Sequence, residues 1–578
     1  MAREISEGKA RRKPPLYEYV AALLFVAYAV AFWLNLEHKW FNSDWTTDDA
    51  LQQIFPFYKA IYPQLFQGDL ITKMMEGYLA PIHYAIGFSL TWLTSDPLMA
   101  GHWIMLLQLV STLLFLFFGV RAAAGTVPAF FAATWLLHTR LLIQRLTGGL
   151  PRGWSASIFA AYFYCALKGQ MNGVIAVIAV GCALHTPATL IVALSHGLFL
   201  LWMSACKETR ATYKPHLIRY IIVAPFFVAF AFFMVQMPED LGTMANLATA
   251  QKMPEFHAGG RFPFLPFEPM LNEIHTFGFE AFIGRLYNPG PFLHAFAPAI
   301  VVLLLLLLVV VAAKKRYAII PEPLLCFFIA TAAVYVASRP LAFRLYVPSR
   351  HLQFPVEMFF IAAFSVGFWR LLVKSGRTQA FVGLVLLGTF IAACSGSGLQ
   401  GSANFNVTRT HKGEAFEWIR ANTPENALIA GDPTFLDDVE LFGVRTGYAT
   451  TETAHPFYDR YYGEIKRRLH ITLAAEYAPT LKEFLKLLEP EKIDYFVFER
   501  EKFLPNNLAN ASYLEPFNAE VASMAHRTPP NFAYFELKKL AGEGHFAPLV
   551  FHDRYALIVD LRELRSYLTE HESDRALP

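Results

Sequence analysis

Leu16–Leu36 reads LYEYVAALLFVAYAVAFWLNL, and shortly after it Ser43–Gln53 reads SDWTTDDALQQ. An apolar run of about 20 residues is long enough for a helix to cross a lipid bilayer. Charged groups beside a bilayer are costly, and where they occur they usually have a function. The sequence therefore predicts a membrane-spanning helix that leads directly to a pair of carboxylates, Asp48 and Asp49, at the membrane surface.

Similar apolar runs continue through the first two thirds of the 578-residue chain. Hydrophobic residues make up 55% of the chain and charged residues 16%, whereas soluble domains carry about a quarter charged residues. The net charge of +3 gives no indication of a nucleic-acid partner. We predict a mainly α-helical, polytopic membrane bundle of about eleven transmembrane helices, followed by a small external α/β domain. The candidate spans are Leu16–Leu36, Leu98–Val120, Val127–Ile143, Gly153–Leu167, Met171–Leu184, Pro187–Ser204, Leu217–Val235, Phe296–Ala313, Glu322–Ala337, Leu352–Val373 and Gln379–Cys394.

Lysine and arginine positions orient these spans, because short cytoplasmic loops of membrane proteins are enriched in both residues. With the basic N-terminal segment inside, every later inside loop contains a basic residue, and the loop from Glu37 to Pro97 falls outside. This arrangement requires that Tyr78–Leu93 lies along the outer surface as an interfacial helix. We expect a multi-pass protein of a bacterial cytoplasmic (inner) membrane with a cytoplasmic N-terminus. The inside loops carry Arg121, Lys168, Lys207, Lys314 and Lys374.

The composition divides the chain into two parts. We place a transmembrane domain at residues 1–399, with external loops at 37–97 and 236–295, and a soluble periplasmic α/β domain at residues 400–578. The flexible segment Ser395–Ser402 (SGSGLQGS) joins them. In the second part, alternating apolar patterns predict strands and helices. They are a helix at Thr410–Arg420, a strand at Ala427–Ala430, a helix at Leu481–Leu488 capped by Thr480, and a strand at Ile493–Glu499.

The carboxylate pair has two interpretations. Thr47 is placed to cap a helix from Asp48 to Tyr58, in which acidic residues of the first turn would complement the helix dipole. A carboxylate at a helix start can also bind a divalent cation such as Mg²⁺ or Mn²⁺, or take a proton from a hydroxyl group. The two interpretations are compatible. Asp48 and Asp49 are therefore both candidate catalytic residues and candidate metal ligands.

Arginines occur in two short external loops, against the usual distribution of basic residues. Ser338–His351 reads SRPLAFRLYVPSRH, and Arg145–Gly153 reads RLTGGLPRG. A guanidinium binds phosphate oxygens through two parallel hydrogen bonds, so an anionic headgroup would explain arginine here, with the amides of Gly148 and Gly149 as further donors. Alternatively, the arginines neutralise external acidic residues or anchor in lipid headgroups. The candidate phosphate-binding residues are Arg145, Arg152, Arg339, Arg344 and Arg350.

Several other polar residues fall near the expected outer surface. We interpret His185, which interrupts an apolar run, as a structural histidine, and His138 and His196 in the same way. The turn Thr451–Pro456 (TETAHP) could line a path for an acceptor or pack the outer domain on the bundle, and we favour packing. Further candidates for lining the site are His83, His185 and Glu76.

The order of these features resembles the GT-C superfamily of integral-membrane glycosyltransferases: an acidic first external loop, interfacial helices, many spans and an external C-terminal domain. The resemblance implies a sugar donor linked to polyprenyl phosphate or diphosphate. It also implies that an acidic residue of the first external loop, here Asp48 or Asp49, serves as base or metal ligand. The C-terminal domain lacks the WWD-type signature of the oligosaccharyltransferase branch, so we do not expect protein N-glycosylation. The stretches Asp48-Asp49-Ala50 with Phe55-Pro56-Phe57-Tyr58, Gly149–Gly153 and Tyr346–Arg350 are in addition similar to a group of bacterial multispan proteins.

The leading hypothesis is an inverting hexosyltransferase that acts at the outer face of the lipid bilayer. A sugar would pass from a polyprenyl-phosphate-linked donor to an envelope glycan or lipid acceptor. The external arginines would hold the donor phosphate, and Asp48, which we favour over Asp49, would deprotonate the acceptor hydroxyl. One alternative is a lipid or glycan transporter or flippase, which should carry broken or charged helices at mid-membrane depth. Another is a non-catalytic scaffold for envelope assembly.

Overall fold

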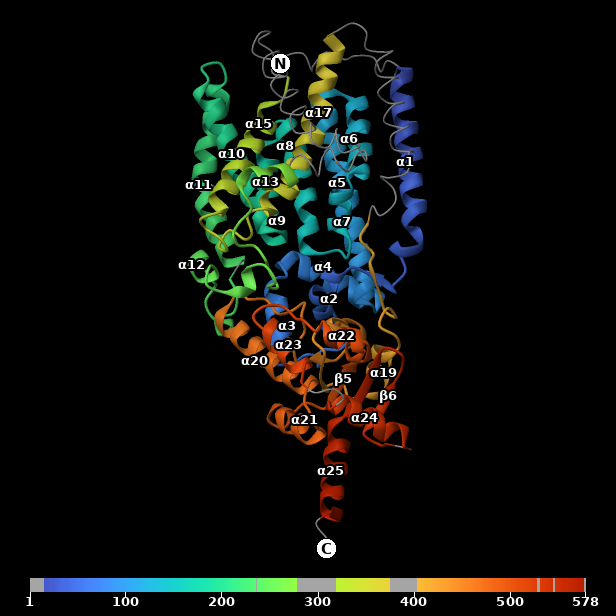
Figure 1. Cartoon of the computed structure of the whole chain (residues 1–578). Helices are drawn as coiled ribbons and strands as arrows, with labels where there is room; N and C mark the ends of the chain where they lie inside the picture. The colour runs from blue at the N-terminus through green and yellow to red at the C-terminus, as the bar shows by residue number, and fades with distance from the viewer. Residues whose placement is uncertain are drawn as a thin grey trace.

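The computed structural model of the chain is a long helical bundle with a smaller, sheet-containing domain at one end (Figure 1). It describes residues 15–234, 236–277, 319–374, 403–527, 531–543 and 546–575. Five segments in these ranges are helical, long and apolar enough to cross a membrane. The chain is thus a mainly helical, multi-pass membrane protein. The five are α1 (Leu16–Trp40), α5 (Pro97–Ala124), α10 (Thr186–Ala205), α11 (Arg210–Met234) and Arg350–Arg370, which α16 (Arg350–Gln353) and α17 (Pro355–Lys374) form.

The predicted spans coincide with helices wherever they fall in the described residues. The prediction for Val127–Ile143 is wrong in one respect, because non-helical backbone at Thr139 divides this segment in two. Phe296–Ala313 and Gln379–Cys394 lie outside the described residues, so the number eleven stays a prediction. The remaining helices at predicted spans are α6 (Thr126–His138), α7 (Arg140–Leu146), α8 (Trp154–Leu167), α9 (Met171–Leu184) and α15 (Glu322–Ser338).

The predicted interfacial helix is α4 (Pro81–Thr94), which lies where the bundle meets the smaller domain (Figure 1). Its buried positions, His83, Gly87 and Thr91, are polar or small, whereas the side chain of Trp92 is 67% exposed. This pattern is the reverse of that in a water-soluble helix and is typical of a helix whose outer face contacts lipid. The structure of α4 therefore suits the interfacial position that the charge distribution requires.

Two of the segments predicted to be cytoplasmic lie at the other end of the bundle. The turn between α10 and α11 and the last residues of α17 are at the top of Figure 1, and the sheet is at the bottom. These two segments contain Lys207 and Lys374. Basic loops and the smaller domain thus occupy opposite ends of the molecule.

The smaller domain is built on a five-stranded sheet with strand order β4–β3–β5–β7–β6. β4, β3 and β5 run parallel to one another. β7 pairs antiparallel with β5, and β6 pairs antiparallel with β7. Phe484 packs on Phe496 of β5 with ring centroids 4.9 Å apart, which anchors a covering helix on the sheet. The strands are β3 (Leu428–Gly431), β4 (Thr446–Gly447), β5 (Tyr495–Glu499), β6 (Leu549–His552) and β7 (Ala556–Asp560).

Three of the four local predictions for this domain are confirmed, and the fourth is wrong at its start. The helix α21 (Leu481–Leu488) has the predicted bounds, and the hydroxyl of Thr480 caps it by accepting the backbone N–H of Glu483 at 3.2 Å. Strands β3 and β5 occupy the two predicted strand positions. The first helix of the domain, α19 (Ala415–Asn422), begins at Ala415 rather than at Thr410.

A two-strand ribbon ties the C-terminal domain to the first external loop. β1 (Trp45–Thr46) pairs antiparallel with β2 (Val407–Thr408). Arg409 donates to the backbone carbonyl of Ser43 at 3.2 Å and lies 3.4 Å from the carboxylate of Asp96. The strands β1 and β2 are short and far apart in the sequence, so no local sequence pattern predicts that they pair. The ribbon fixes the chain immediately before Asp48.

The described part of the second external loop, residues 236–277, also packs on the C-terminal domain. Lys466 forms an ion pair of 2.9 Å with buried Glu255 of that loop. The ring of Phe457 lies 5.1 Å from that of Phe262 and 5.3 Å from that of Phe343, measured between centroids. Three loops of the bundle and the C-terminal domain therefore form one continuous layer.

Candidate active site

The acidic pair begins a short helix, α2 (Asp48–Gln53), and a 3₁₀ turn follows instead of the predicted continuation to Tyr58. The side chain of Thr47 forms no cap bond, because its hydroxyl donates to Oδ1 of Asp48 at 2.8 Å. The same oxygen accepts the backbone N–H of Asp49 at 2.9 Å. Thr47 thus occupies the predicted N-cap position of α2, with Asp48 and Asp49 in the first turn, but its side chain forms no capping hydrogen bond. Its hydroxyl helps to fix the carboxylate of Asp48, which is exposed and has no basic partner among the described residues.

Two asparagines from the segment before β2 complete the support of this carboxylate. Asn404 donates its side-chain N–H to the hydroxyl oxygen of Thr47 at 3.1 Å. The side-chain oxygen of Asn406 accepts the backbone N–H of Asp48 at 3.3 Å. The residues just after the predicted linker thus contribute directly to the geometry of the acidic pair.

Asp49 has a different environment, because it is paired with Arg152. The guanidinium donates to Oδ2 of Asp49 at 2.6 Å. Burial acts to raise the pKa of Asp49, but Arg152 and, less strongly, Arg145 and Arg350 outweigh it and hold the pKa below its usual value. A carboxylate with a lowered pKa is a weak base. Asp49 is therefore suited to holding Arg152 and not to taking a proton.

The turn at Gly148-Gly149 brings the two flanking arginines beside α2. Both glycines have a positive φ, +83° and +65°. A Cβ atom on Gly149 would lie 2.1 Å from the carbonyl oxygen of Gly101 in α5, and one on Gly148 would lie 2.9 Å from Thr47. The N–H of Gly149 donates to the carbonyl of Leu146 at 3.0 Å, so the expectation that this amide binds an anion is wrong. These glycines permit close packing between the turn, α2 and α5.

Arg145 has no ion-pair partner in the part of the chain that the structure describes. No described residue forms a hydrogen bond or ion pair with its guanidinium. Burial, together with Arg350 and Arg152, lowers the pKa of Arg145 to about 10, and Asp49 opposes this effect. Arg350 donates to the side-chain oxygen of Gln353 at 2.8 Å. A partly buried guanidinium among like charges is unfavourable, and an anionic ligand would relieve it.

The structure does not bring the other two arginines to this cluster. Arg339 donates to Glu273 at 2.9 Å and to the hydroxyl of Tyr335 at 3.0 Å, so the neutralisation alternative describes its environment. The side chain of Arg344 is exposed and has no hydrogen bond or ion pair within the described ranges. Of the five predicted phosphate-binding residues, Arg145, Arg152 and Arg350 surround Asp49.

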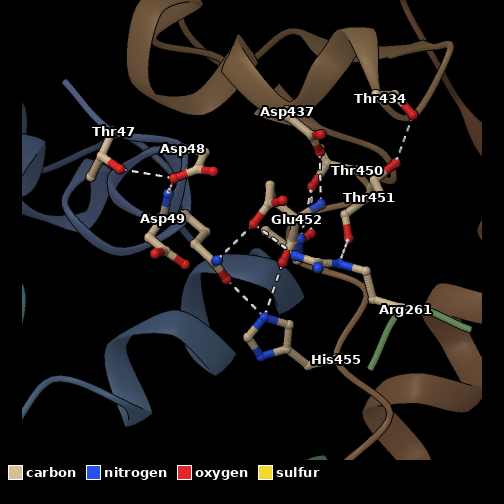
Figure 2. Close-up of polar contacts among 12 residues, drawn as sticks. Thr47, Asp48, Asp49, Arg261, Thr434, Asp437, Thr450, Thr451, Glu452 and His455 are labelled. Atoms are coloured by element: carbon tan, nitrogen blue, oxygen red, sulfur yellow. Dashed lines mark hydrogen bonds and ion pairs between the residues drawn. The ribbon is translucent and has the colours of Figure 1, made fainter. Parts of the chain in front are cut away.

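A further carboxylate, Glu452, approaches the acidic pair from the C-terminal domain (Figure 2). Its Oε2 accepts a hydrogen bond from Gln52 of α2 at 2.8 Å and forms an ion pair of 2.7 Å with Arg261 of the second external loop. Burial raises the pKa of Glu452, and the negative charges of Asp49 and Asp48 add to this, whereas Arg261 opposes it. Glu452 lies in the turn Thr451–Pro456, for which the sequence left open a role in lining an acceptor path, whereas Gln52 and Arg261 were not predicted as site residues. No spacing signal relates the three, because they come from three separate parts of the chain.

His455 completes the junction between α2 and the C-terminal domain. Its Nε2 lies 2.7 Å from the side-chain oxygen of Gln52, and its Nδ1 lies 3.2 Å from the hydroxyl of Tyr78. Burial, with a contribution from Arg261, lowers the pKa of His455 to about 3, so the ring is neutral. The favoured interpretation of Thr451–Pro456 as a packing turn is confirmed, and the same turn also carries Glu452.

The other predicted lining residues have structural partners. His83 is buried and accepts a hydrogen bond from the indole N–H of Trp154 at 3.0 Å. The ring of His185 caps the start of α10, which confirms its structural interpretation. Glu76 forms an ion pair of 2.6 Å with Lys59. No hydrogen bond or ion pair within the described ranges links these three residues to Asp48 or Asp49.

No protein-family model matches the sequence, and a search of curated proteins finds no match. Solved structures do match. The oligosaccharyltransferase of Archaeoglobus fulgidus in the apo form is 13% identical, covers 88% of this chain and 72% of its own, and has a TM-score of 0.50. ArnT from Cupriavidus metallidurans bound to undecaprenyl phosphate is 11% identical to this chain. The match covers 95% of this chain and 98% of ArnT, with a TM-score of 0.46. The arabinofuranosyltransferase AftD from Mycobacteria is 14% identical to this chain. The match covers 83% of this chain and 35% of AftD, with a TM-score of 0.44.

These structural neighbours are GT-C glycosyltransferases. The chain has a GT-C fold. The resemblance expected from the order of its sequence features is therefore confirmed at the level of the fold. One fold supports many reactions, so the activity of the chain depends on the residues of its own site.

The described residues provide no complete set of ligands for the predicted divalent cation. Another structure of the Archaeoglobus fulgidus enzyme, with a TM-score of 0.45, contains Zn and sulfate. In the described part of the present chain, no group of three or more His, Cys, Asp or Glu side chains is arranged to hold a metal ion. Mg²⁺ requires near-octahedral oxygen coordination, and Asp49 is already occupied by Arg152. The described residues therefore do not fit a metal site, and the cation stays a prediction.

Proposed function

We propose that the chain is a membrane glycosyltransferase that transfers a sugar from a polyprenyl-phosphate-type donor to an envelope glycan or lipid acceptor. The observation that carries this proposal is the convergence of the acidic pair with Arg145, Arg152 and Arg350 on the layer between the bundle and the C-terminal domain. A base beside a phosphate-binding cluster is what transfer from a phosphate-linked sugar requires. The GT-C fold supports the same class of reaction.

In the proposed mechanism, Asp48 is the general base. One of its oxygens is fixed by Thr47 and by the backbone N–H of Asp49, which leaves the other free to accept a proton. As the acceptor hydroxyl loses its proton to Asp48, its oxygen forms a bond with the anomeric carbon of the sugar. The bond between that carbon and the phosphate oxygen breaks, and the polyprenyl phosphate leaves with the electron pair. Attack opposite to the leaving group inverts the anomeric configuration and makes the enzyme an inverting hexosyltransferase.

The arginines stabilise the charge that develops on the leaving phosphate. Arg145 supplies a guanidinium without any other partner among the described residues, and Arg350 extends the positive field around it. Arg152 is held by Asp49, so Asp49 acts as a positioning residue. We assign Arg339 to the structure of the second external loop because Glu273 occupies its guanidinium. Arg344 has no assigned role.

The membrane orientation follows the basic loops. We infer a bacterial inner-membrane protein with a cytoplasmic N-terminus and a periplasmic C-terminal domain. The site would then face the periplasm, where lipid-linked sugars and envelope acceptors meet. A transporter or flippase and a non-catalytic scaffold remain the alternative classes, and no specific contact favours either of them.

A deletion strain tests the proposed activity whichever sugar the enzyme transfers. Loss of the enzyme should cause one lipid-linked sugar to accumulate, and mass spectrometry of extracted lipids detects it. The gene for the intact chain should remove this species, whereas the variant Asp48→Asn, expressed at the same level in the membrane, should not. If no lipid-linked sugar accumulates, or if Asp48→Asn restores the wild-type profile, the proposal is wrong.

A further inference from the structure

Among the described residues of the C-terminal domain, Glu452 is the one carboxylate that hydrogen-bonds to the helix of the acidic pair. Gln52 and Arg261 both bind its Oε2, at 2.8 Å and 2.7 Å. No described residue hydrogen-bonds to Oε1, and the side chain remains 21% exposed. Glu452 therefore has one anchored oxygen and one oxygen available to a ligand.

The geometry of α2 places this available oxygen near the acidic pair. Residues three and four positions apart lie on the same face of a helix, so Gln52 shares its face with Asp49 and Asp48. Because Gln52 holds Glu452, the carboxylate of Glu452 is fixed over that face. Figure 2 shows Glu452 between the acidic pair and Arg261. An acceptor hydroxyl at Asp48 would lie beside the outer domain.

Hydroxyl groups continue this polar surface within the C-terminal domain. The side-chain oxygens of Thr434 and Thr451 lie 3.1 Å apart, and Thr451 also contacts the hydroxyl of Tyr513 at 2.9 Å. Thr451 directly precedes Glu452, so the row begins next to the carboxylate. Hydroxyl groups both donate and accept hydrogen bonds, whereas an ionised carboxylate only accepts them. Together they match a ligand that presents several hydroxyl groups.

We propose that Glu452 binds the acceptor, and that the acceptor is a carbohydrate with neighbouring hydroxyl groups. Oε1 of Glu452 accepts a hydrogen bond from the hydroxyl next to the one that Asp48 deprotonates. This inference rests on the proposed function and deepens it by choosing the glycan from the two acceptor classes. An acceptor that lacks a second hydroxyl would leave Oε1 of Glu452 without a hydrogen-bond donor. Sites built around a hydrogen bond strongly disfavour such ligands.

The variant Glu452→Gln tests the assignment. Its side-chain oxygen can still accept from Gln52 and Arg261, but its amide replaces the available oxygen with a donor. The matched control is Glu425→Gln, because Glu425 accepts from Gln64 of the first external loop at 2.7 Å in an equivalent contact away from the acidic pair. Both variants are made in the full-length chain and reconstituted in lipid nanodiscs. The donor is the lipid-linked sugar from the deletion strain, and the acceptor is the envelope glycan fraction of that strain.

Glu452→Gln should raise the acceptor concentration for half-maximal rate about tenfold or more, which corresponds to the loss of one hydrogen bond to a charged group. Its maximal rate at saturating acceptor and its melting temperature should equal those of Glu425→Gln. An unchanged acceptor KM overturns the inference, as does a loss confined to kcat. If the wild-type protein transfers sugar to the lipid fraction of the strain and not to the glycan fraction, the inference is wrong and the proposed function stands. If it transfers sugar to neither fraction, the proposed function itself fails.

A second measurement uses only the wild-type protein. Periodate cleaves carbon–carbon bonds between neighbouring hydroxyl groups, so treatment of the acceptor fraction alone, followed by quenching, should abolish transfer. A sham-treated fraction serves as the control. Transfer to the oxidised fraction at the control rate would exclude an acceptor that depends on neighbouring hydroxyl groups.

Discussion

At the scale of single residues, the two adjacent aspartates have different roles because they have different partners. Asp48 accepts hydrogen bonds from the hydroxyl of Thr47 and a backbone N–H, both neutral donors. Asp49 accepts a hydrogen bond from the guanidinium of Arg152 at 2.6 Å. The sequence identified the pair as a candidate site but could not separate its members. The separation depends on Arg152, which is about a hundred positions away in the sequence. It became visible only in the folded chain.

The substitutions Asp48→Asn and Asp49→Asn should therefore differ in kind. Removal of the base should lower kcat about 10²–10⁴-fold with little change in donor KM. Asp49→Asn should mainly raise donor KM, because Arg152 loses the carboxylate that orients it. Steady-state kinetics with the purified lipid-linked donor separates the two effects. A larger loss of kcat in Asp49→Asn than in Asp48→Asn would reverse the assignment.

Arg145→Ala should weaken the enzyme while leaving the fold as stable as before, or more stable. The guanidinium is partly buried among Arg152 and Arg350, and no described residue offsets its charge. We expect donor KM to rise about tenfold or more, as for a lost hydrogen bond to a charged group. Arg339→Ala is the matched control, because that substitution removes the ion-pair partner of buried Glu273 and should lower the melting temperature. Thermal unfolding that destabilises Arg145→Ala as much as Arg339→Ala would show that Arg145 is structural.

At the scale of elements, hydropathy and charge predicted the spans well, because the membrane imposes one strong constraint on every helix. The failures occur where a contact between distant segments decides the structure. The backbone at Thr139 ends α6 before the predicted boundary, and α2 ends at Gln53. The ribbon of β1 with β2 joins segments more than 350 positions apart in register Trp45↔Thr408. Two-residue strands carry no periodic signal that could have revealed it.

The close packing of the Gly148-Gly149 turn against α5 can be tested by substitution. Gly149→Ala combines a positive φ of +65° with a Cβ atom 2.1 Å from the backbone oxygen of Gly101. The backbone of α5 cannot yield easily, so we expect a cost of about 1–3 kcal/mol from overpacking in addition to the φ strain. Activity should fall as well, because the turn positions Arg145 and Arg152.

Gly169→Ala is the control for backbone strain alone. Gly169 has a φ of +74°, and a Cβ atom there meets no atom within 4 Å. Melting temperatures of the two variants should therefore differ, with Gly149→Ala lower by about 1–3 °C for a cost of this size in a chain of this length. Equal melting temperatures would mean that the turn does not pack against α5 as the structure has it.

At the scale of the whole molecule, the site lies where the bundle, two external loops and the C-terminal domain meet. The sequence predicted the two parts of the chain and the loop that holds Asp48 and Asp49. It did not predict that Arg261 and Glu452 would meet Gln52, because such a junction depends on how separate domains pack. The sequence indicated His455 only as part of a polar turn. Burial makes its ring a neutral hydrogen-bonding group at the junction.

The junction should be sensitive to acid through His455. The pKa of this ring is about 3 in the folded protein, below the ordinary value of 6.5, so the unfolded chain takes up a proton first as the pH falls. Stability from the neutral ring is complete above about pH 6.5 and decreases below it, by about 2 kcal/mol at pH 5. Glu452 and other carboxylates with raised pKa values act in the opposite direction, so the comparison has to be made between variants.

The variant His455→Gln removes the titrating ring and keeps a polar side chain. Its melting temperature should decrease less than that of the wild-type protein between about pH 7.5 and pH 5. Parallel pH profiles of the two proteins would contradict a buried neutral histidine at this junction.

The central claim is that Asp48 acts as the base of a lipid-linked sugar transfer. The most direct measurement combines the purified full-length protein with the lipid-linked sugar isolated from the deletion strain and the acceptor fraction of the same strain. The wild-type protein should release polyprenyl phosphate and form a glycosidic product of inverted anomeric configuration, whereas Asp48→Asn, equally folded, should form neither above background. Unchanged donor with the wild-type protein, or wild-type turnover by Asp48→Asn, would contradict the claim.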